Sequence, residues 1–164
     1  RQVCSISPKE NNVINIIPES KELGYVGKPK KINKEKILNF INNKQIPIVV
    51  PLGLGDDGRI YNINADVAAG SIAKEIDARR LLLMTDVEGV LDENQKLISE
   101  INLNKANEML KNNIISGGMI PKINTCLDAI SNGVRGVVIV DGRKPHSILF
   151  ELFSDKGAGT LIRK

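Results

Sequence analysis

Short apolar runs alternate along the chain with longer segments in which apolar residues recur every three or four positions. Residues 13–17 read as a short strand that Pro18 ends, and residues 46–52, 80–85 and 136–140 are continuous apolar runs typical of buried parallel strands. Strands that alternate with helices predict an α/β fold. We expect a mainly parallel open sheet with helices on both faces.

Four segments have the periodicity of helices. Asn33 can cap the first, in which Ile37, Leu38 and Ile41 share one face, and Asn64 precedes an alanine-rich helix within 65–76. The other two are residues 102–113 and a segment marked by Ile120, Ile123, Leu127 and Ile130. Glycines and a proline within residues 19–31 predict a loop there.

Composition places the chain among globular proteins. Its 164 residues are 41% hydrophobic and 26% charged, about one domain's worth of sequence. No apolar run approaches the ~18 residues of a membrane span, which predicts a soluble protein without a membrane partner. The chain begins at Arg1 with no signal-peptide pattern, and "RQVCSIS" reads as the middle of a strand. We therefore expect a piece of a longer protein.

Charge and cysteine content exclude other classes. The net charge is only +4, the densest basic run is "KPKK", and two Tyr, three Phe and no Trp offer few surfaces for base stacking. Nucleic acid is therefore not an expected partner. Cys4 and Cys126 lie far apart and form no metal-ligand pattern, so we expect buried small residues in a reducing compartment.

Three polar stretches follow predicted strands, where ligands of parallel sheets bind: "PLGLGDDG", "TDVEGVL" and "VDGR". Neither the phosphate-binding pattern GxxxxGK[ST] nor the dinucleotide pattern GxGxxG is present, although "GLGDDG" is close to the second in spacing. The single histidine, His146, lacks a nucleophile motif and is interpreted as structural or regulatory.

The stretch "SGGMIPKIN" combines a glycine hinge with a helix start and one cation. Pro121 suits the first turn of a helix, and Gly117 and Gly118 can turn backbone amides toward one point. A lysine at this end of a helix is unfavourable by roughly 0.3–1 kcal/mol unless an anion binds there. Lys122 is therefore either a phosphate-binding cation or a surface lysine at a loop–helix junction.

"YNINAD" opens the alanine-rich helix. Asn64 and Asp66 suit the helix cap and the helix dipole, and capping is the favoured interpretation. Asn62 is not needed for the cap, so its amide can serve a carboxylate or carbonyl group of a ligand.

Taken together, "YNINAD", "LLLMTDVEGVL", "SGGMIPKIN" and "VDGRKPHSILFELFSDKGAGTLI" resemble the acetylglutamate kinases, a branch of the amino-acid kinase family. "LGYVGKPKKIN" is similar to a substrate-side hairpin of that branch, and "GTLI" to its terminal strand. Segments found upstream in the family are absent, so the chain resembles the second half to two-thirds of such an enzyme. By this resemblance, residues 1–45 complete a substrate-side domain and residues 46–164 form the nucleotide-binding domain.

The resemblance implies transfer of a phosphoryl group from ATP, with Mg²⁺, to the side-chain carboxylate of N-acetyl-L-glutamate in arginine biosynthesis. It implies that Lys122 stabilises the transferring group, that Asp66 orients catalytic lysines, and that Asn62 and Asn64 bind substrate, Asn62 at its α-carboxylate end. The implied nucleotide-binding residues are Thr85, Asp86, Gly89, Leu91, Ile114, Ile115 and Ser116. No residue is expected to bind a metal directly. The alternatives are another amino-acid kinase, acting on aspartate, carbamate or uridylate, and a nucleotide-binding fragment without catalysis.

Regulation is implied by the same resemblance. Glu151 and Gly157 are similar to an arginine-binding site, although Val138 stands where many relatives have histidine. The alternative is a solvated helix residue and a turn glycine. The resemblance further implies a homo-oligomer (dimer or hexamer) and a PII signalling partner. A location in a plastid stroma or a bacterial cytoplasm is expected from the family and from the abundance of Ile, Asn and Lys.

Overall fold

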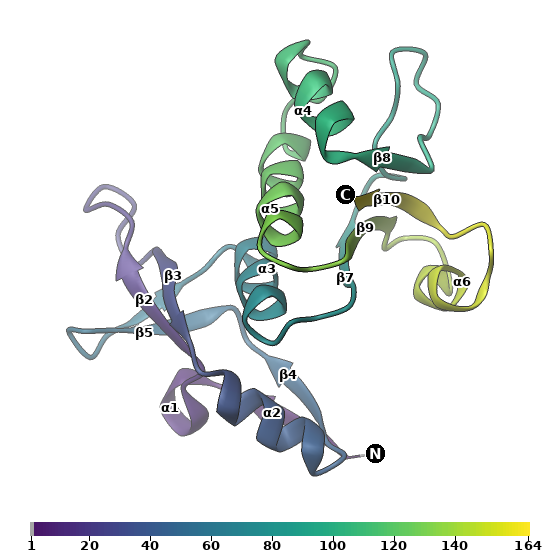
Figure 1. The fold of residues 1–164 in the computed structure, drawn as a ribbon. Helices are drawn as coiled ribbons and strands as arrows, with labels where there is room; N and C mark the ends of the chain where they lie inside the picture. The colour runs from purple at the N-terminus through teal and green to yellow at the C-terminus, as the bar shows by residue number, and fades with distance from the viewer. Residues whose placement is uncertain (1) are drawn as a thin grey trace. The chain divides into compact units, whose positions relative to one another are not determined.

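A computed structural model describes residues 2–164 of the chain. It divides into two compact units, Arg1–Ile76 and Asp77–Lys164 (Figure 1). This boundary differs from the functional division expected at residues 45 and 46, and that functional division stays a prediction. No helix within residues 2–164 is long and apolar enough to cross a membrane.

The first unit contains a four-stranded sheet and a separate pair of strands. Its elements are β1 (Val3–Ile6), α1 (Pro8–Asn11), β2 (Ile14–Pro18), β3 (Gly27–Ile32), α2 (Lys34–Asn42), β4 (Ile46–Val49), β5 (Leu52–Gly55), β6 (Ile60–Asn62) and α3 (Ala65–Glu75). The sheet order is β3-β2-β5-β6, and β1 pairs with β4 in parallel. Ile14 and Ile16 of β2 are fully buried and pack in a core with Ile37 and Tyr61.

Both predicted helices of this unit are confirmed together with their caps. The Asn33 side chain accepts a hydrogen bond from the Lys36 amide, and α2 buries Ile37 but leaves Ile41 exposed. The Asn64 side chain accepts from the amides of Asp66 and Val67, and α3 contacts β3 and buries Ala68 in the core of this unit. Local capping chemistry therefore set both helix starts as the sequence indicated.

Two predictions for this unit are wrong. Residues 19–31 are not all loop, because β3 pairs antiparallel with β2 through its backbone although its lysines give it a polar sequence. Residues 46–52 are not one buried strand, because β4 and β5 join different sheets on either side of Val50 and Pro51. Ile46 and Ile48 of β4 are 45% and 54% exposed, so this strand is not buried as expected.

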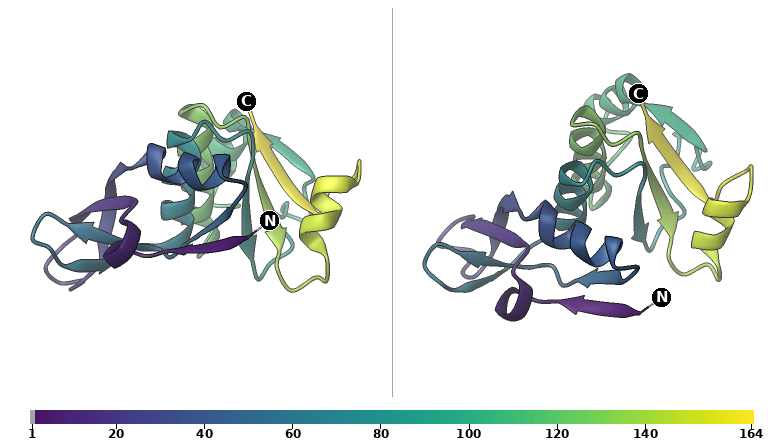
Figure 2. Two further views of the ribbon diagram at one scale, coloured as in Figure 1. Left: turned by 90° about the horizontal axis from the view of Figure 1, so that it is seen from below. Right: turned by 60° about the horizontal axis from the view of Figure 1, so that its bottom comes forward.

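The second unit is a four-stranded sheet with helices on both sides. Its elements are β7 (Leu81–Thr85), β8 (Glu100–Asn102), α4 (Leu103–Lys111), α5 (Met119–Ser131), β9 (Gly136–Asp141), α6 (Ser147–Phe153) and β10 (Gly159–Arg163). The order is β7-β9-β10-β8, with β10 antiparallel to β9. Every residue of β9 is buried, and α5 and α6 contact it from opposite sides of the sheet (Figures 1 and 2).

The predicted elements of this unit are confirmed. Strands β7 and β9 coincide with the apolar runs, Asn102 caps α4, and α5 contains the predicted periodic isoleucines. Cys126 is buried in α5, whereas Cys4 of the first unit is half-buried. The α/β fold class is therefore confirmed, with sheets that combine parallel and antiparallel pairs.

Candidate active site

The carboxyl ends of β7 and β9 lie side by side, because the strands are parallel with Thr85 paired to Asp141. The Gly142 amide donates to the Thr85 carbonyl oxygen at 2.8 Å, and Thr85 Oγ1 donates to Asp86 Oδ1 at 3.2 Å. "TDVEGVL" and "VDGR" therefore leave the same edge of the sheet, as the sequence predicted. Ligands of such sheets bind at this edge.

The third polar stretch, "PLGLGDDG", forms β5 and the turn that leads back antiparallel into β6. Asp57 Oδ1 accepts from the Arg59 amide at 3.1 Å, and Tyr61 Oη donates to Asp57 Oδ2 at 2.8 Å. These hydrogen bonds, the Arg59 amide first, hold the pKa of Asp57 below its ordinary value. Asp56 pairs with Lys30. Both carboxylates thus have partners within this unit, and the stretch is a stabilised turn.

Asp141 is a buried carboxylate at the end of β9. Its oxygens accept two bonds from the Arg143 side chain, Nε to Oδ1 at 2.9 Å and Nη2 to Oδ2 at 3.0 Å, and one from the Arg143 amide at 2.9 Å. These bonds lower the pKa of Asp141 to about 2. Lys144, which directly follows "VDGR", pairs with Glu88 of "TDVEGVL" at 2.6 Å, so an ion pair joins the two segments.

We expect Asp141→Asn to destabilise the second unit at neutral pH. Because the folded-state pKa of Asp141 lies below its ordinary value, its stabilisation is present above about pH 4 and is lost as the pH falls toward about 2. Thermal melts from pH 7 to pH 2 should therefore show a Tm gap to wild type that narrows below about pH 4. Arg143→Ala removes the same ion pair, and its Tm difference from wild type should narrow over the same pH range. A Tm difference that stays constant with pH would contradict this assignment.

After the end of β7 the chain forms a short hairpin over residues 90–98. Leu91 and Leu97 form an antiparallel bridge, and the Ile98 amide donates to the Val90 carbonyl oxygen at 2.9 Å. Asp92 Oδ1 accepts from the amides of Asn94 and Lys96, which closes the turn. This hairpin was not predicted, because its polar turn has no periodic apolar pattern.

A hollow of about 250 Å³ lies between this hairpin region and the segment that leads into α5. Five of the seven residues expected to bind nucleotide line it: Gly89, Leu91, Ile114, Ile115 and Ser116. Thr85 and Asp86 lie just before this lining, at the end of β7. Val87 and Val90 also line it and lie within "TDVEGVL", in the segment that the resemblance places at the nucleotide. The lining residues that sequence reasoning missed are Asp92, Gln95 and Met119, and their only signal was proximity in sequence to the motif residues.

The start of α5 matches "SGGMIPKIN". Gly117 has a φ of +55°, which glycine adopts readily, and Pro121 lies in the first turn. Met119 lines the hollow, and Lys122 follows at i+3 on the same side of the helix, half-buried. The amides of Met119 and Ile120 donate to the carbonyl oxygens of Ser116 and Gly117 at 3.2 Å. The expectation that Gly117 and Gly118 turn backbone amides toward one point stays a prediction.

The predicted substrate-side residues belong to the first unit. Asn64 Oδ1 accepts from the amides of Asp66 at 3.0 Å and Val67 at 3.2 Å, which confirms the capping interpretation. Asn62 ends β6, and its backbone amide donates to the Tyr25 carbonyl oxygen at 2.8 Å, while its side chain is exposed. The side-chain amide of Asn62 is therefore accessible to a ligand. The substrate role of Asn64 and the orienting role of Asp66 stay predictions.

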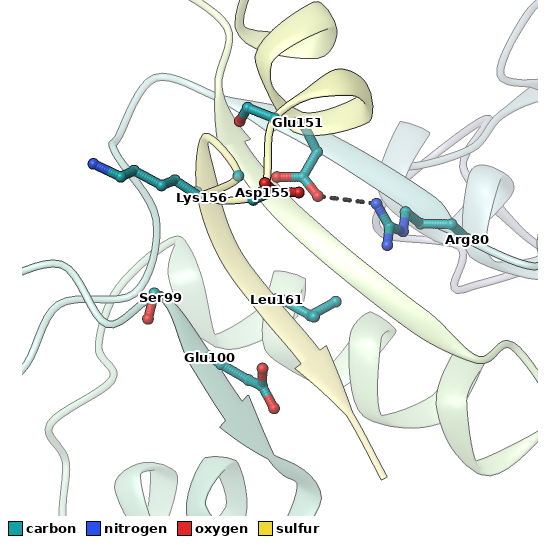
Figure 3. Close-up of a pocket in the computed structure, with 10 residues that line it drawn as sticks. Arg80, Ser99, Glu100, Glu151, Asp155, Lys156 and Leu161 are labelled. Carbon is teal, nitrogen blue, oxygen red and sulfur yellow. Dashed lines mark hydrogen bonds and ion pairs between the residues drawn. The ribbon is translucent and has the colours of Figure 1, made fainter.

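A second hollow of about 250 Å³ surrounds Glu151 (Figure 3). The short helix α6 turns Ser147 and Glu151 inward, and Glu151 is only 8% exposed. Its Oε1 accepts from Arg80 Nη1 at 3.2 Å, and its Oε2 accepts from the Ala158 amide at 3.0 Å. The alternative that Glu151 is a solvated helix residue is therefore wrong.

Gly157 faces the same carboxylate. Its φ is +67°, and a Cβ at this position would lie 2.8 Å from Glu151 Oε2. The structure thus brings Glu151 and Gly157 together as the resemblance implied. Val138 is fully buried within β9 and pairs with Leu82 and Leu161. An apolar residue fits this core position.

An α/β sheet with a hollow beside its strand ends is typical of nucleotide-binding folds. Residues 2–141 match the amino acid kinase family, and the chain belongs to that family. It is 59% identical over 159 residues to the acetylglutamate kinase of Pelagibacter ubique (strain HTCC1062), a match that covers 97% of this chain and 55% of that protein.

Two further proteins match nearly the whole of this chain. The acetylglutamate kinase of Clostridioides difficile (strain 630) is 50% identical over 166 residues, which covers 99% of this chain and 57% of that protein. The crystal structure of smu.665 from Streptococcus mutans UA159 has a TM-score of 0.82 at 33% identity and covers 99% of this chain and 61% of that one. The chain therefore spans about half the length of the curated relatives that it matches.

Proposed function

We propose that this chain carries the nucleotide-binding part of an acetylglutamate kinase. The observation that supports it most is the hollow that gathers Gly89, Leu91 and Ser116 beside the helix start bearing Lys122. The chain spans about half the length of its relatives. The activity is therefore proposed for the full-length protein, that is, a protein of its relatives' length that includes this chain.

The proposed reaction transfers the γ-phosphoryl group of ATP to N-acetyl-L-glutamate. A side-chain carboxylate oxygen of the substrate forms the new bond to phosphorus, the bond from phosphorus to the β–γ bridging oxygen breaks, and ADP leaves. Lys122 stabilises the charge on the transferring group, Asp66 orients the lysines, and Asn62 binds the α-carboxylate of the substrate. Such electrostatic stabilisation and positioning supply most of the catalysis in phosphoryl transfer.

Mg²⁺ belongs to this proposal as the partner of ATP. Within residues 2–164 no three His, Cys, Asp or Glu side chains gather as a metal site. Mg²⁺ in kinase sites is commonly held by substrate phosphates, one or two carboxylates and water, and it demands no all-protein cage. Asp86 directly follows β7 and is exposed, so it places one carboxylate at the edge of the sheet that "TDVEGVL" and "VDGR" leave.

The test is an acceptor comparison with the full-length protein. Incubated with ATP and Mg²⁺, it should form ADP with N-acetyl-L-glutamate, and hydroxylamine should trap the acyl phosphate as a hydroxamate. Aspartate, carbamate and uridylate serve as competing acceptors at equal concentration. Preferred turnover of one of these would make the protein another amino-acid kinase. ATP binding without transfer to any of them would make it a non-catalytic nucleotide-binding protein.

Regulation by arginine is part of the same proposal, with the Glu151 hollow as the site. A carboxylate can pair bidentately with a guanidinium group, and the hollow is lined by the further polar residues Ser99, Glu100 and Asp155. A homo-oligomer, dimer or hexamer, and a PII partner stay predictions from the resemblance. The bacterial sources of both curated relatives favour a bacterial cytoplasm over a plastid stroma.

A further inference from the structure

A single buried hydroxyl group joins the hairpin over residues 90–98 to the sheet. Thr160, the second residue of β10, is fully buried and pairs with Ile139 of β9. Its Oγ1 accepts a hydrogen bond from the Val90 amide at 2.8 Å and donates one to the Ile98 carbonyl oxygen at 2.7 Å. One side chain therefore contacts both strands of a hairpin more than sixty residues away in sequence.

These bonds close a ring, because the Ile98 amide donates to the Val90 carbonyl oxygen at 2.9 Å. The hydroxyl of Thr160 uses its one proton and one lone pair in the ring, so neither backbone group is left unpaired. Gly89 fits directly against it: its φ is +146°, and a Cβ there would lie 2.6 Å from Thr160 Oγ1. The approach of the hairpin to β10 is thus set by a glycine and a hydroxyl in contact.

We propose that Thr160 is a positioning residue for the nucleotide site. Gly89 and Val90 line the hollow on one side, and Thr160 holds the Val90 amide from behind without lining the hollow itself. The proposal rests on the proposed function, because it takes this hollow as the ATP site. Neither the motifs nor the resemblance gave Thr160 a role.

The expected effect is on nucleotide binding rather than on the chemical step. Replacing the hydroxyl by a methyl group leaves a buried amide and a buried carbonyl without their partner, so the hairpin must shift to satisfy them. A displaced wall weakens contacts that ATP makes in both the ground state and the transition state. Such uniform binding appears in KM and not in kcat.

The experiment compares Thr160→Val, Thr160→Ser and Ile162→Val in the full-length protein. Thr160→Val should raise the Kd and the KM for ATP by about fivefold or more, with kcat and the KM for N-acetyl-L-glutamate within about twofold of wild type. Thr160→Ser keeps the hydroxyl and should stay within about twofold in ATP affinity. Ile162→Val removes a buried methyl group from the same face of β10 and controls for lost packing.

The outcomes separate the inference from the function it rests on. If wild type transfers phosphate from ATP and Thr160→Val binds ATP as wild type does, Thr160 is not a positioning residue. Equal losses in Thr160→Val and Ile162→Val would also overturn the inference, since they would report packing alone. No ATP binding by wild type would overturn the proposed function as well. If Thr160→Val does not fold, Thr160→Cys, a weaker donor and acceptor, should still weaken ATP binding, and unchanged binding would refute the role.

Discussion

Lys122→Ala in the full-length protein is expected to lower kcat by about a hundredfold or more while the KM for N-acetyl-L-glutamate changes little. Lys122 lies in the first turn of α5, where a cation is unfavourable by roughly 0.3–1 kcal/mol unless an anion is bound. Met119, one turn earlier on the same side, lines the proposed nucleotide hollow. The expected loss follows from the proposed role of Lys122, which stabilises the charge on the transferring phosphoryl group.

Initial rates at varied ATP and acceptor concentrations test this effect. Lys111→Ala is the matched control, because Lys111 is an exposed lysine at the end of α4 and should leave kcat near wild type. Lys122→Arg keeps the charge but changes its shape, so only partial activity is expected. A near-wild-type kcat for Lys122→Ala would make Lys122 a surface lysine at a loop–helix junction.

The elements that sequence predicted well have their cause in local chemistry. Asn33, Asn64 and Asn102 each accept amide hydrogen bonds at a helix start, and such a cap needs only residues two or three positions away. Strands β7 and β9 are apolar because helices and neighbouring strands cover them, so a continuous apolar run was a sufficient signal.

The failures have a non-local cause. β3 is a strand because its backbone pairs with β2. Lys28, Lys30 and Lys31 are compatible with this pairing because they lie at exposed positions of the strand. Val50 and Pro51 divide the apolar run 46–52, and its two halves join different sheets. The pattern of apolar residues gives no sign of this division. In both cases the pairing with another strand decides the structure, and the segment's own residue pattern does not show it.

The candidate site divides in the same way. The resemblance supplied Gly89, Leu91 and Ser116, and the structure gathers them at one hollow. The groups that hold this hollow in shape could not be found from sequence, because Thr160 meets Val90 across 70 residues. The cooperation of Asp66 with Lys122 rests on the resemblance and stays a prediction.

Glu151→Gln is expected to raise the arginine concentration for half-inhibition of the full-length protein at least about tenfold, which corresponds to about 1.4 kcal/mol of binding. Glu151 is buried beside Gly157, and its carboxylate accepts one bond from Arg80 and one from the Ala158 amide. An ionised carboxylate has about four acceptor positions, so two remain for an incoming guanidinium group. Glutamine keeps an oxygen for the Ala158 amide but loses the charge that binds arginine.

The structure also indicates what opposes this binding. Arg80 already places a guanidinium group against Glu151 Oε1, so the effector must share the carboxylate with it or displace it (Figure 3). Arg80→Met should therefore lower the half-inhibiting arginine concentration, opposite in sign to Glu151→Gln, while kcat without arginine stays near wild type in both. Inhibition curves at saturating substrates measure both shifts. A full-length enzyme indifferent to millimolar arginine would refute the site. Val138, apolar where the resemblance places a histidine, would then be the first residue to blame.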